Sequence, residues 1–429
     1  MQKEKVNTTS KKRKIIKIIA LVTAFIATFT CGYFFYHFIN IGSTTLVGSV
    51  VNLINNTAYL IDPATGEQRY LTEEEIADLI VDAYMDRYSE YYTKEEYEQR
   101  MSESQGNASG FGLNFYANSN KIYKVTGNSP AAKAGIKKDD RLLSYKYGEV
   151  VRSVQTNGLG LEGLAAIEGQ ETTFVILRGE QTLEFKIEKT EYTVTYIEYY
   201  DSQVKYYFQS DGGDKEPKAI TDTNAGMIEL DQKTAYIKFD LFEGDSARQM
   251  KDALEFMVER GRENLILDMR NNGGGNLNVL TEIASLFIDN QGKRDNVVAY
   301  AKTRNGEEKY QTSGNGFVKG LKKVSIIANM NTASASECLI GALLHYGDVL
   351  TMDRVVIEKN GAGEAKTYGK GIMQTTFWLA KGGALKITTG KMFWPDNQTS
   401  IHQVGIIALD KNAVEREDAI SRAQSCFYE

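Results

Sequence analysis

Two short segments of this chain carry the residues best suited to covalent chemistry. The first is Asn331-Thr-Ala-Ser-Ala-Ser-Glu337, in which serines lie among small residues just before an apolar stretch typical of a helix. The second is Tyr368-Gly-Lys-Gly-Ile-Met-Gln374, in which Lys370 is flanked by glycines. A serine hydroxyl is a weak nucleophile until a neighbouring base takes its proton, and a lysine held neutral by burial can be that base. Together the segments predict acyl transfer at a serine–lysine pair.

The histidines of the chain give little support for a different base. There are three, His37, His345 and His402, and none lies in a motif that would supply a Ser-His-Asp arrangement. Gln374 stands four positions after Lys370. Because side chains of a strand repeat every two residues, Gln374 would lie on the same side as Lys370 and orient its amine. Taken alone, a lysine between two glycines is usually a surface residue.

Three hydroxyls compete for the role of nucleophile. Ser334 is the first candidate, and Ser336 and Thr332 compete with it by proximity alone. The N–H groups and positive dipole end of the helix that begins here would stabilise an oxyanion. A structural alternative is that Ser334 caps this helix, with Glu337 three residues later completing a capping box. The residue types alone leave the choice of nucleophile open.

A glycine turn upstream is the candidate oxyanion site. The apolar strand Leu265-Ile-Leu-Asp268 is followed by Met269-Arg270 and then by Asn271-Asn-Gly-Gly-Gly275. Glycines let backbone N–H groups approach a substrate carbonyl closely, although the same residues would also suit an ordinary strand-to-helix turn. Asp268 and Arg270 are expected to form an ion pair that holds the turn. The candidate oxyanion donors are the N–H groups of Gly274, Gly275 and Ser334.

These segments resemble the carboxyl-terminal processing peptidases, which are tail-specific Ser/Lys proteases. The resemblance covers roughly residues 75–410 and includes the segments around Asp268, Ser334 and Lys370 and the closing Ser400-Ile-His-Gln-Val-Gly-Ile406. It implies that Ser334, three residues before the glutamate, is the nucleophile. It further implies that Lys370 is the base and that Gln374 assists it. The family usually has proline where this chain has Gly273.

Strands and helices alternate in residues 191–429, which predicts an α/β core. The predicted strands include 235–239, 265–268 and 324–328, and the predicted helices include 246–260 and 334–346. The family resemblance implies a crotonase-like arrangement of this peptidase core. We therefore expect an α/β fold in which the core carries an inserted β-rich α+β domain.

The inserted domain is predicted over residues 105–190 and resembles a PDZ domain. Asn128 to Leu143 contains Ser-Pro-Ala-Ala-Lys-Ala-Gly-Ile, in which Pro130 begins a short helix and Gly135 ends it. PDZ grooves bind a peptide as an added strand and hold its terminal carboxylate on backbone N–H groups. A simpler interpretation of Gly110 and Gly112, which precede this segment, is an ordinary hairpin turn. The candidate peptide-binding residues are Gly110, Phe111, Gly112 and Leu113.

The N-terminal residues predict a membrane anchor. A basic tail, residues 1–14, precedes an apolar stretch, residues 15–40, of which 18–39 contains no Asp, Glu, Lys or Arg. This length can cross a bilayer as a helix, and the basic tail should stay in the cytoplasm. The catalytic part would then lie outside the cytoplasm, after a stalk and helical segment over residues 41–104. The alternative is a cleaved signal peptide, which shares the basic start and apolar centre.

Composition narrows the function further. The 429-residue chain has a formal net charge of −6, which does not support nucleic-acid binding. Its three cysteines and few histidines show no metal-ligand spacing, so no metal and no cofactor are predicted. The sequence therefore predicts a single-pass membrane serine endopeptidase that cleaves proteins or peptides with accessible C-termini. The alternative is a catalytically silent PDZ scaffold on a peptidase-like core.

Overall fold

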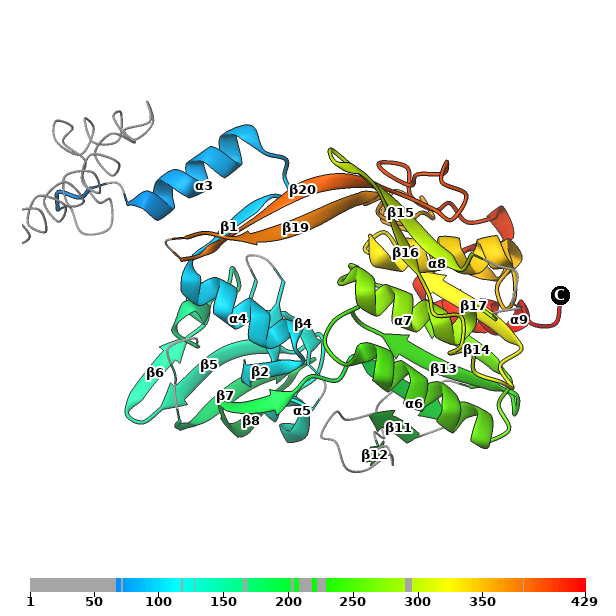
Figure 1. Ribbon diagram of the computed structural model, residues 1–429. Coiled ribbons are helices and arrows are strands. Elements are labelled where there is room, and N and C mark those ends of the chain that lie inside the picture. The colour runs from blue at the N-terminus through cyan, green and yellow to red at the C-terminus, as the bar shows by residue number, and fades with distance from the viewer. Residues whose placement is uncertain are drawn as a thin grey trace, which may run out of the picture. The chain divides into compact units, whose positions relative to one another are not determined.

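The computed structural model describes residues 67–429 with gaps, and the chain divides into two compact units, residues 1–84 and 85–429 (Figure 1). The gaps are residues 71, 117–118, 127, 165–166, 168, 202–203, 208–217, 222–228, 290–294 and 381. The predicted membrane span lies outside the described residues. Within the described part of the chain, no helix is long and apolar enough to cross a membrane. Residues 85–104 belong to the larger unit. From the sequence, they were expected to belong to the stalk and helical segment over residues 41–104.

The described part of the first unit contains one helix, α3 (Glu73–Tyr84). Its start is stabilised by a reciprocal capping box. The Thr72 N–H donates to the Glu75 carboxylate at 2.9 Å, and the Glu75 N–H donates to the Thr72 hydroxyl at 3.1 Å. This pattern satisfies two backbone donors that have no partner within the helix.

An eight-stranded mixed sheet forms the core of the larger unit. Its order is β12-β11-β10-β13-β14-β17-β18-β21, and β13, β14, β17, β18 and β21 run parallel. The strands are β10 (Ile197–Asp201), β11 (Val204–Tyr207), β12 (Lys218–Thr221), β13 (Thr234–Phe239), β14 (Asn264–Asp268), β17 (Lys323–Ala328), β18 (Val355–Glu358) and β21 (Ala413–Val414). Parallel strands of this kind are buried on both faces, because the connecting helices cover them.

Helices cover the two faces of this sheet. Alternate residues such as Leu265 and Leu267 pack in one cluster with α6, α7 and α8, while Ile266 and its neighbours Tyr236 and Ile327 pack against α9 on the other face. Figure 1 shows α9 separated from α6 and α7 by the sheet. The helices are α6 (Ser246–Glu259), α7 (Leu277–Phe287), α8 (Ala335–Tyr346) and α9 (Ala419–Ser425), with 3-10 turns η2 (Met352–Arg354), η3 (Asp410–Asn412) and η4 (Arg416–Asp418). The predicted mixed α/β content is confirmed.

A second sheet carries the lysine segment. In this sheet β1 pairs with β20, β20 with β15, and β15 with β16, while β19 also pairs with β20. The long β19–β20 hairpin is drawn in orange in Figure 1. Its strands are β1 (Glu90–Tyr92), β15 (Val297–Thr303), β16 (Gly306–Gln311), β19 (Ile372–Trp378) and β20 (Ala384–Phe393). Because β1 pairs with β20, the segment just before Glu90 is held on the same sheet as Gln374.

Residues 107–193 form a β-rich region with its own apolar cluster around Phe174 and Ile122. Leu161–Leu164 form a 3-10 turn, η1. The other elements are β2 (Asn107–Gly110), β3 (Leu113–Phe115), β4 (Ile122–Val125), α5 (Pro130–Ala134), β5 (Arg141–Tyr147), β6 (Val150–Ser153), β7 (Glu171–Arg178), β8 (Gln181–Glu188) and β9 (Thr190–Thr193), preceded by α4 (Lys94–Ser104).

Candidate active site

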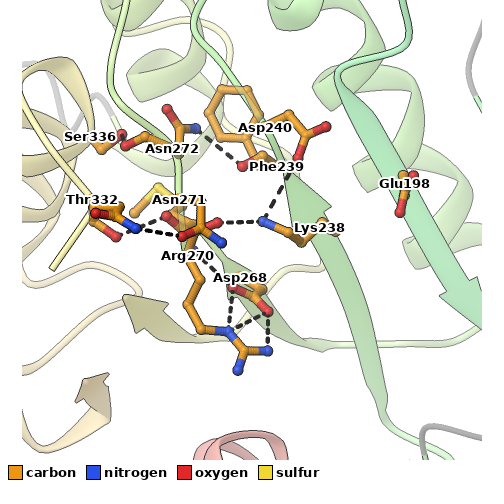
Figure 2. Close-up of polar contacts among 12 residues, drawn as sticks. Glu198, Lys238, Phe239, Asp240, Asp268, Arg270, Asn271, Asn272, Thr332 and Ser336 are labelled. Carbon is orange, nitrogen blue, oxygen red and sulfur yellow. Dashed lines mark hydrogen bonds and ion pairs between the residues drawn. The ribbon is translucent and has the colours of Figure 1, made fainter. Parts of the chain in front are cut away.

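The three candidate hydroxyls differ in what surrounds them. Thr332 is fully buried, and its hydroxyl donates to the Met269 carbonyl at 2.9 Å. Ser336 is also fully buried, and its hydroxyl donates to the Asn272 carbonyl at 3.0 Å (Figure 2). Ser334 lies between them and is only partly buried. Of the three hydroxyls, that of Ser334 is the one best placed to meet a substrate.

Ser334 has a backbone conformation that is rare for a residue with a side chain. Its φ is 59° and its ψ is −118°, at the residue that precedes the first turn of α8. Such a conformation costs on the order of 1–3 kcal/mol and persists only where surrounding contacts hold it. Gly274 supplies part of that constraint. A Cβ on Gly274 would lie 2.8 Å from the Ser334 Cβ and from the Ala335 nitrogen, so only glycine fits here.

Asparagine side chains hold the glycine turn against the serine segment. The Asn271 side-chain oxygen accepts hydrogen bonds from the amides of Asn329 and Asn331, at 3.1 and 2.9 Å. Asn272 is fully buried, and its side chain donates to the Phe239 carbonyl at 3.2 Å and accepts from the Gly274 N–H at 3.0 Å. Figure 2 shows Asn271 and Asn272 between strand β13 and the segment that carries Thr332 and Ser336. The turn and the serine segment are therefore positioned as one body.

An ion cluster anchors the start of this turn. Arg270 pairs with Asp268 at 2.6 Å, as predicted, and with Glu358 at 3.0 Å. Burial acts to raise the pKa of Asp268, but the charges of Lys238 and Arg270 outweigh it and hold that pKa below its usual value. Lys238 also donates to the Arg270 carbonyl at 2.6 Å (Figure 2). These groups hold the turn in place.

The structure brings Lys370 and Gln374 together. The Lys370 amine donates to the Gln374 side-chain oxygen at 2.8 Å, and the Gln374 side-chain nitrogen donates to the Tyr88 carbonyl. The Tyr88 ring also lies close, with its centroid 5.1 Å from the amine. Burial lowers the pKa of Lys370, and the charge of Lys386 lowers it further, while Asp86 opposes the shift. A larger fraction of the amine is therefore neutral near pH 7, as a base requires.

The Glu337 carboxylate joins the serine and lysine segments. It is fully buried in α8, and one of its oxygens accepts hydrogen bonds from the backbone N–H groups of Ser334 and Lys370, at 2.9 and 3.0 Å. The other oxygen accepts from the Gly369 N–H at 2.8 Å and the Thr367 hydroxyl at 2.5 Å. Burial raises the pKa of Glu337, and these four donors oppose that shift. One side chain thus fixes the backbone of both candidate catalytic residues.

The sequence did not predict two sets of contacts in this site, those of Glu337 and those of Tyr88. Glu337 was expected to cap α8 but not to bind Gly369 and Lys370, because those contacts link residues far apart in the chain. Tyr88 lies in the Asp86-Arg-Tyr-Ser-Glu-Tyr-Tyr92 segment and was given no role at the lysine. This segment lies within residues 75–410, over which the chain resembles the peptidase family, and that position was the available signal. Its pairing with β20 through Glu90–Tyr92 explains how it reaches Gln374.

The candidate oxyanion donors lie near Ser334 but differ in their present partners. The Gly274 N–H donates to the Asn272 side chain, and the Ser334 N–H donates to Glu337. Gly275 lies against Phe242, since a Cβ on Gly275 would come within 2.3 Å of the Phe242 carbonyl oxygen. The Ala335 nitrogen faces Gly274 at the start of α8 and is a further candidate, which the sequence reasoning did not name.

The candidate peptide-binding residues 110–113 join β2 to β3. Phe111 is buried, and its ring centroid lies 4.9 Å from that of Phe174. Gly112 has φ 81°, and a Cβ there would overlap the Ser129 side chain. Ser129 caps α5 by accepting the Ala132 N–H at 3.2 Å. This loop is therefore packed directly against the beginning of α5.

Comparison with known families gives the class of this core. Residues 233–408 match the model of peptidase family S41. This span includes the glycine turn, Ser334, Lys370 and Gln374. This match assigns residues 233–408 to peptidase family S41 and confirms the family expected from the motifs.

Several relatives from Staphylococcus species carry the name "Probable CtpA-like serine protease". The protein from Staphylococcus epidermidis is 32% identical over 345 residues, which cover 78% of this chain and 59% of the relative. The protein from Staphylococcus haemolyticus is 28% identical over 351 residues, which cover 81% of this chain and 61% of the relative. This chain therefore spans about three fifths of the length of these relatives. Among solved structures, the photosystem II D1 C-terminal processing protease aligns with 84% of this chain and 86% of its own, at 18% identity and a TM-score of 0.45.

Proposed function

We propose that this protein is a serine endopeptidase in which Ser334 is the nucleophile and Lys370 is the general base. The observation that carries the proposal is the Glu337 carboxylate, which binds the backbone N–H groups of both residues. Lys370, with its lowered pKa, takes the proton of the serine hydroxyl as the serine attacks a peptide carbonyl. Gln374 orients the amine by accepting its hydrogen bond.

The tetrahedral intermediate would place its oxyanion between the glycine turn and the start of α8. Gly274 meets Ser334 and Ala335 at this position, Gly275 follows Gly274 in the turn, and the positive end of the helix dipole favours negative charge there. An oxyanion here competes with Asn272 and Glu337 as acceptor for the N–H groups that they now hold. Collapse of the intermediate releases the leaving amine, which takes the proton held by Lys370, and water then hydrolyses the acyl-enzyme on Ser334.

Two further parts of the proposal concern substrate and location. We propose that residues 105–190 act as a PDZ domain that captures the C-terminal tail of the substrate, with the 110–113 loop at its carboxylate. The β-rich content of this region and the close packing of Gly112 on Ser129 support this role. We also propose that residues 15–40 anchor the protein in the membrane, with the catalytic part outside the cytoplasm. Membrane pelleting and digestion by external protease test the anchor.

Labelling with a fluorophosphonate probe tests the catalytic proposal. The full-length chain should become labelled on Ser334, as located by mass spectrometry of the labelled peptide. Ser334→Ala should abolish labelling and peptide cleavage, and Lys370→Met should reduce both by about 10⁴-fold or more. Ser336→Ala is the matched control, because its hydroxyl is buried and donates to the Asn272 carbonyl.

Two results would decide against the proposal. Retained labelling and cleavage in Ser334→Ala would assign the nucleophile elsewhere. If no residue is labelled while a tail peptide still binds residues 105–190, the protein is a silent scaffold.

A further inference from the structure

A cavity of about 500 Å³ opens beside the candidate base. It lies within the larger unit, and we call it the Arg87 cavity. Gly369, the neighbour of Lys370, lines it, and so does Tyr88, whose ring lies 5.1 Å from the Lys370 amine. Its wall includes Asp86, Arg87, Tyr88, Tyr368, Ile372 and His402.

Three polar side chains of this cavity form a directed series of hydrogen bonds. The Arg87 guanidinium donates to the Tyr88 hydroxyl at 2.6 Å, and the Tyr88 hydroxyl donates to the Tyr368 hydroxyl at 3.3 Å. Because each hydroxyl has one proton, the Tyr368 proton is left to be donated outward. Tyr368 is 42% exposed, so an incoming acceptor can reach it. This series of hydrogen bonds therefore ends at the Tyr368 hydroxyl, which can donate to an acceptor group of a ligand.

The positive charge of the Arg87 guanidinium is available to bind an anionic ligand. No carboxylate among the described residues pairs with its guanidinium, which instead lies 4.8 and 5.7 Å from the ring centroids of Tyr88 and Tyr368. A guanidinium presents five N–H donors in a planar fork, which matches a carboxylate. One donor is used by Tyr88. The others remain available for two parallel hydrogen bonds.

A cationic ligand fits the cavity poorly. The aromatic rings that would bind a cation are already occupied by Arg87. Asp86 is the one carboxylate in the wall, and its Oδ1 accepts the Tyr88 N–H at 3.1 Å and the Ser89 hydroxyl at 2.9 Å. These hydrogen bonds direct the Asp86 carboxylate toward donors within the 86–89 turn. The cavity therefore favours an anion.

The position of Lys370 indicates which part of a substrate enters. In the proposed mechanism, the base that takes the serine proton must give it to the leaving amine, so the leaving segment lies beside the Lys370 amine. The Arg87 cavity lies near that amine, because Gly369 and Tyr88 line it and the Tyr88 ring centroid is 5.1 Å from the amine. Resting on the proposed peptidase function, we propose that the Arg87 cavity binds a carboxylate of the leaving segment. That carboxylate is either an acidic side chain near the cleaved bond or the C-terminal carboxylate of a short leaving segment.

Matched substrates test this specificity. One set is amidated at its C-terminus and carries Glu, Gln or Lys directly after the cleaved bond. The other set has a two-residue leaving segment that ends in a free carboxylate or an amide. At least one carboxylate source should raise kcat/KM about 10-fold over its neutral match, as a charge-assisted hydrogen bond would. The comparison between sets tells which source is used.

Variants of the full-length chain assign the preference to Arg87. Arg87→Gln should bring the carboxylate-to-neutral ratio close to one, while kcat/KM for the neutral substrates changes little. Arg87→Lys should retain part of the ratio, because it keeps the charge without the planar fork. The control is Lys319→Gln, which removes one positive charge from an exposed loop and should leave the ratio unchanged. An unchanged ratio in Arg87→Gln, or no carboxylate preference in either set, would overturn the proposal.

A binding measurement separates this proposal from the peptidase proposal. The leaving-side peptides Glu-Ala-Ala amide, Gln-Ala-Ala amide, Ala-Ala and Ala-Ala amide are titrated into Ser334→Ala by calorimetry, where no turnover is required. Tighter binding of an acidic peptide, lost in the Ser334→Ala/Arg87→Gln double variant, would support the cavity even if no substrate were cleaved. Equal binding of acidic and neutral peptides, in a chain whose unmodified form is labelled on Ser334, would reject the cavity and leave the peptidase proposal standing.

Discussion

The serine and lysine segments of the candidate site are positioned in different ways. Ser334 is fixed through its backbone, by Gly274, by Glu337 and by the asparagine contacts that join the glycine turn to its segment. The Lys370 backbone is also fixed, but its amine lies at the end of a long side chain. That amine depends on one hydrogen bond to Gln374, which in turn depends on the Tyr88 carbonyl.

This difference follows from the lengths of the two side chains. The serine oxygen is one bond from Cβ, so the backbone conformation decides where it lies. A lysine amine is separated from the backbone by four flexible torsions, and holding it costs on the order of 1.5–2 kcal/mol of side-chain entropy. Backbone substitutions should therefore damage the serine side most, and loss of a side-chain partner should damage the lysine side most.

Among substitutions that leave Ser334 and Lys370 themselves in place, the largest effect is expected for Gly274→Ala. The added Cβ would lie 2.8 Å from Ser334 and Ala335, and the φ of 101° disfavours alanine. Displacing this turn from the oxyanion position should reduce kcat/KM by about 10²–10³-fold. Gly273→Ala is the matched control, because a Cβ there meets no atom within 4 Å. Equal losses in the two variants, with folding checked by circular dichroism, would contradict a constraint specific to Gly274.

A smaller loss is expected for Gln374→Ala. Without its acceptor the Lys370 amine is no longer oriented, and misplacement of a catalytic group by 1 Å can cost about 100-fold in rate. We expect kcat to fall by up to this factor while fluorophosphonate labelling slows in parallel. The control is Thr375→Ala on the same strand, where the hydroxyl contacts Thr389 at 2.7 Å. A similar loss in Thr375→Ala would indicate damage to β19 instead of loss of the amine contact.

The pH dependence of the rate should move in opposite directions in two variants. Burial and then Lys386 lower the pKa of Lys370, and Asp86 raises it. Because the neutral amine is the active form, activity should rise with pH through this lowered pKa. Lys386→Gln should shift that rise to higher pH, and Asp86→Asn should shift it to lower pH. Profiles of kcat/KM against pH measure both, and a shift of the same sign in the two variants would exclude this electrostatic account.

The same pKa shift has a consequence for stability. A lysine whose pKa is lower in the folded chain than in the unfolded chain binds fewer protons when folded, so its ionisation penalises the folded state. Stability should therefore increase as the pH rises from the folded pKa of Lys370 toward its ordinary value of 10.5. In Lys370→Met this contribution disappears. The free energy of unfolding measured in urea at several pH values would show the difference between the two chains.

The sequence predicted the local features of this site better than its long-range contacts. The helix after Ser334, the Asp268–Arg270 pair and the pairing of Lys370 with Gln374 all depend on residues close together in the chain, and the structure contains each of them. The contact between Gln374 and Tyr88 joins residues far apart in sequence, and no periodicity or spacing encodes it. The contacts of Glu337 with Gly369 and Lys370 could not be predicted for the same reason.

The smallest effect is expected at Gly273, where the serine side should tolerate change. The φ of Gly273 lies outside the left-handed range, and a Cβ would enter open space. Alanine restricts the unfolded chain more than glycine does, so Gly273→Ala should raise the free energy of unfolding by about 0.4–1 kcal/mol. Urea unfolding measures this change, and activity should stay the same. A loss of stability would mean that the backbone constraint at Ser334 extends through the whole glycine turn instead of acting at Gly274.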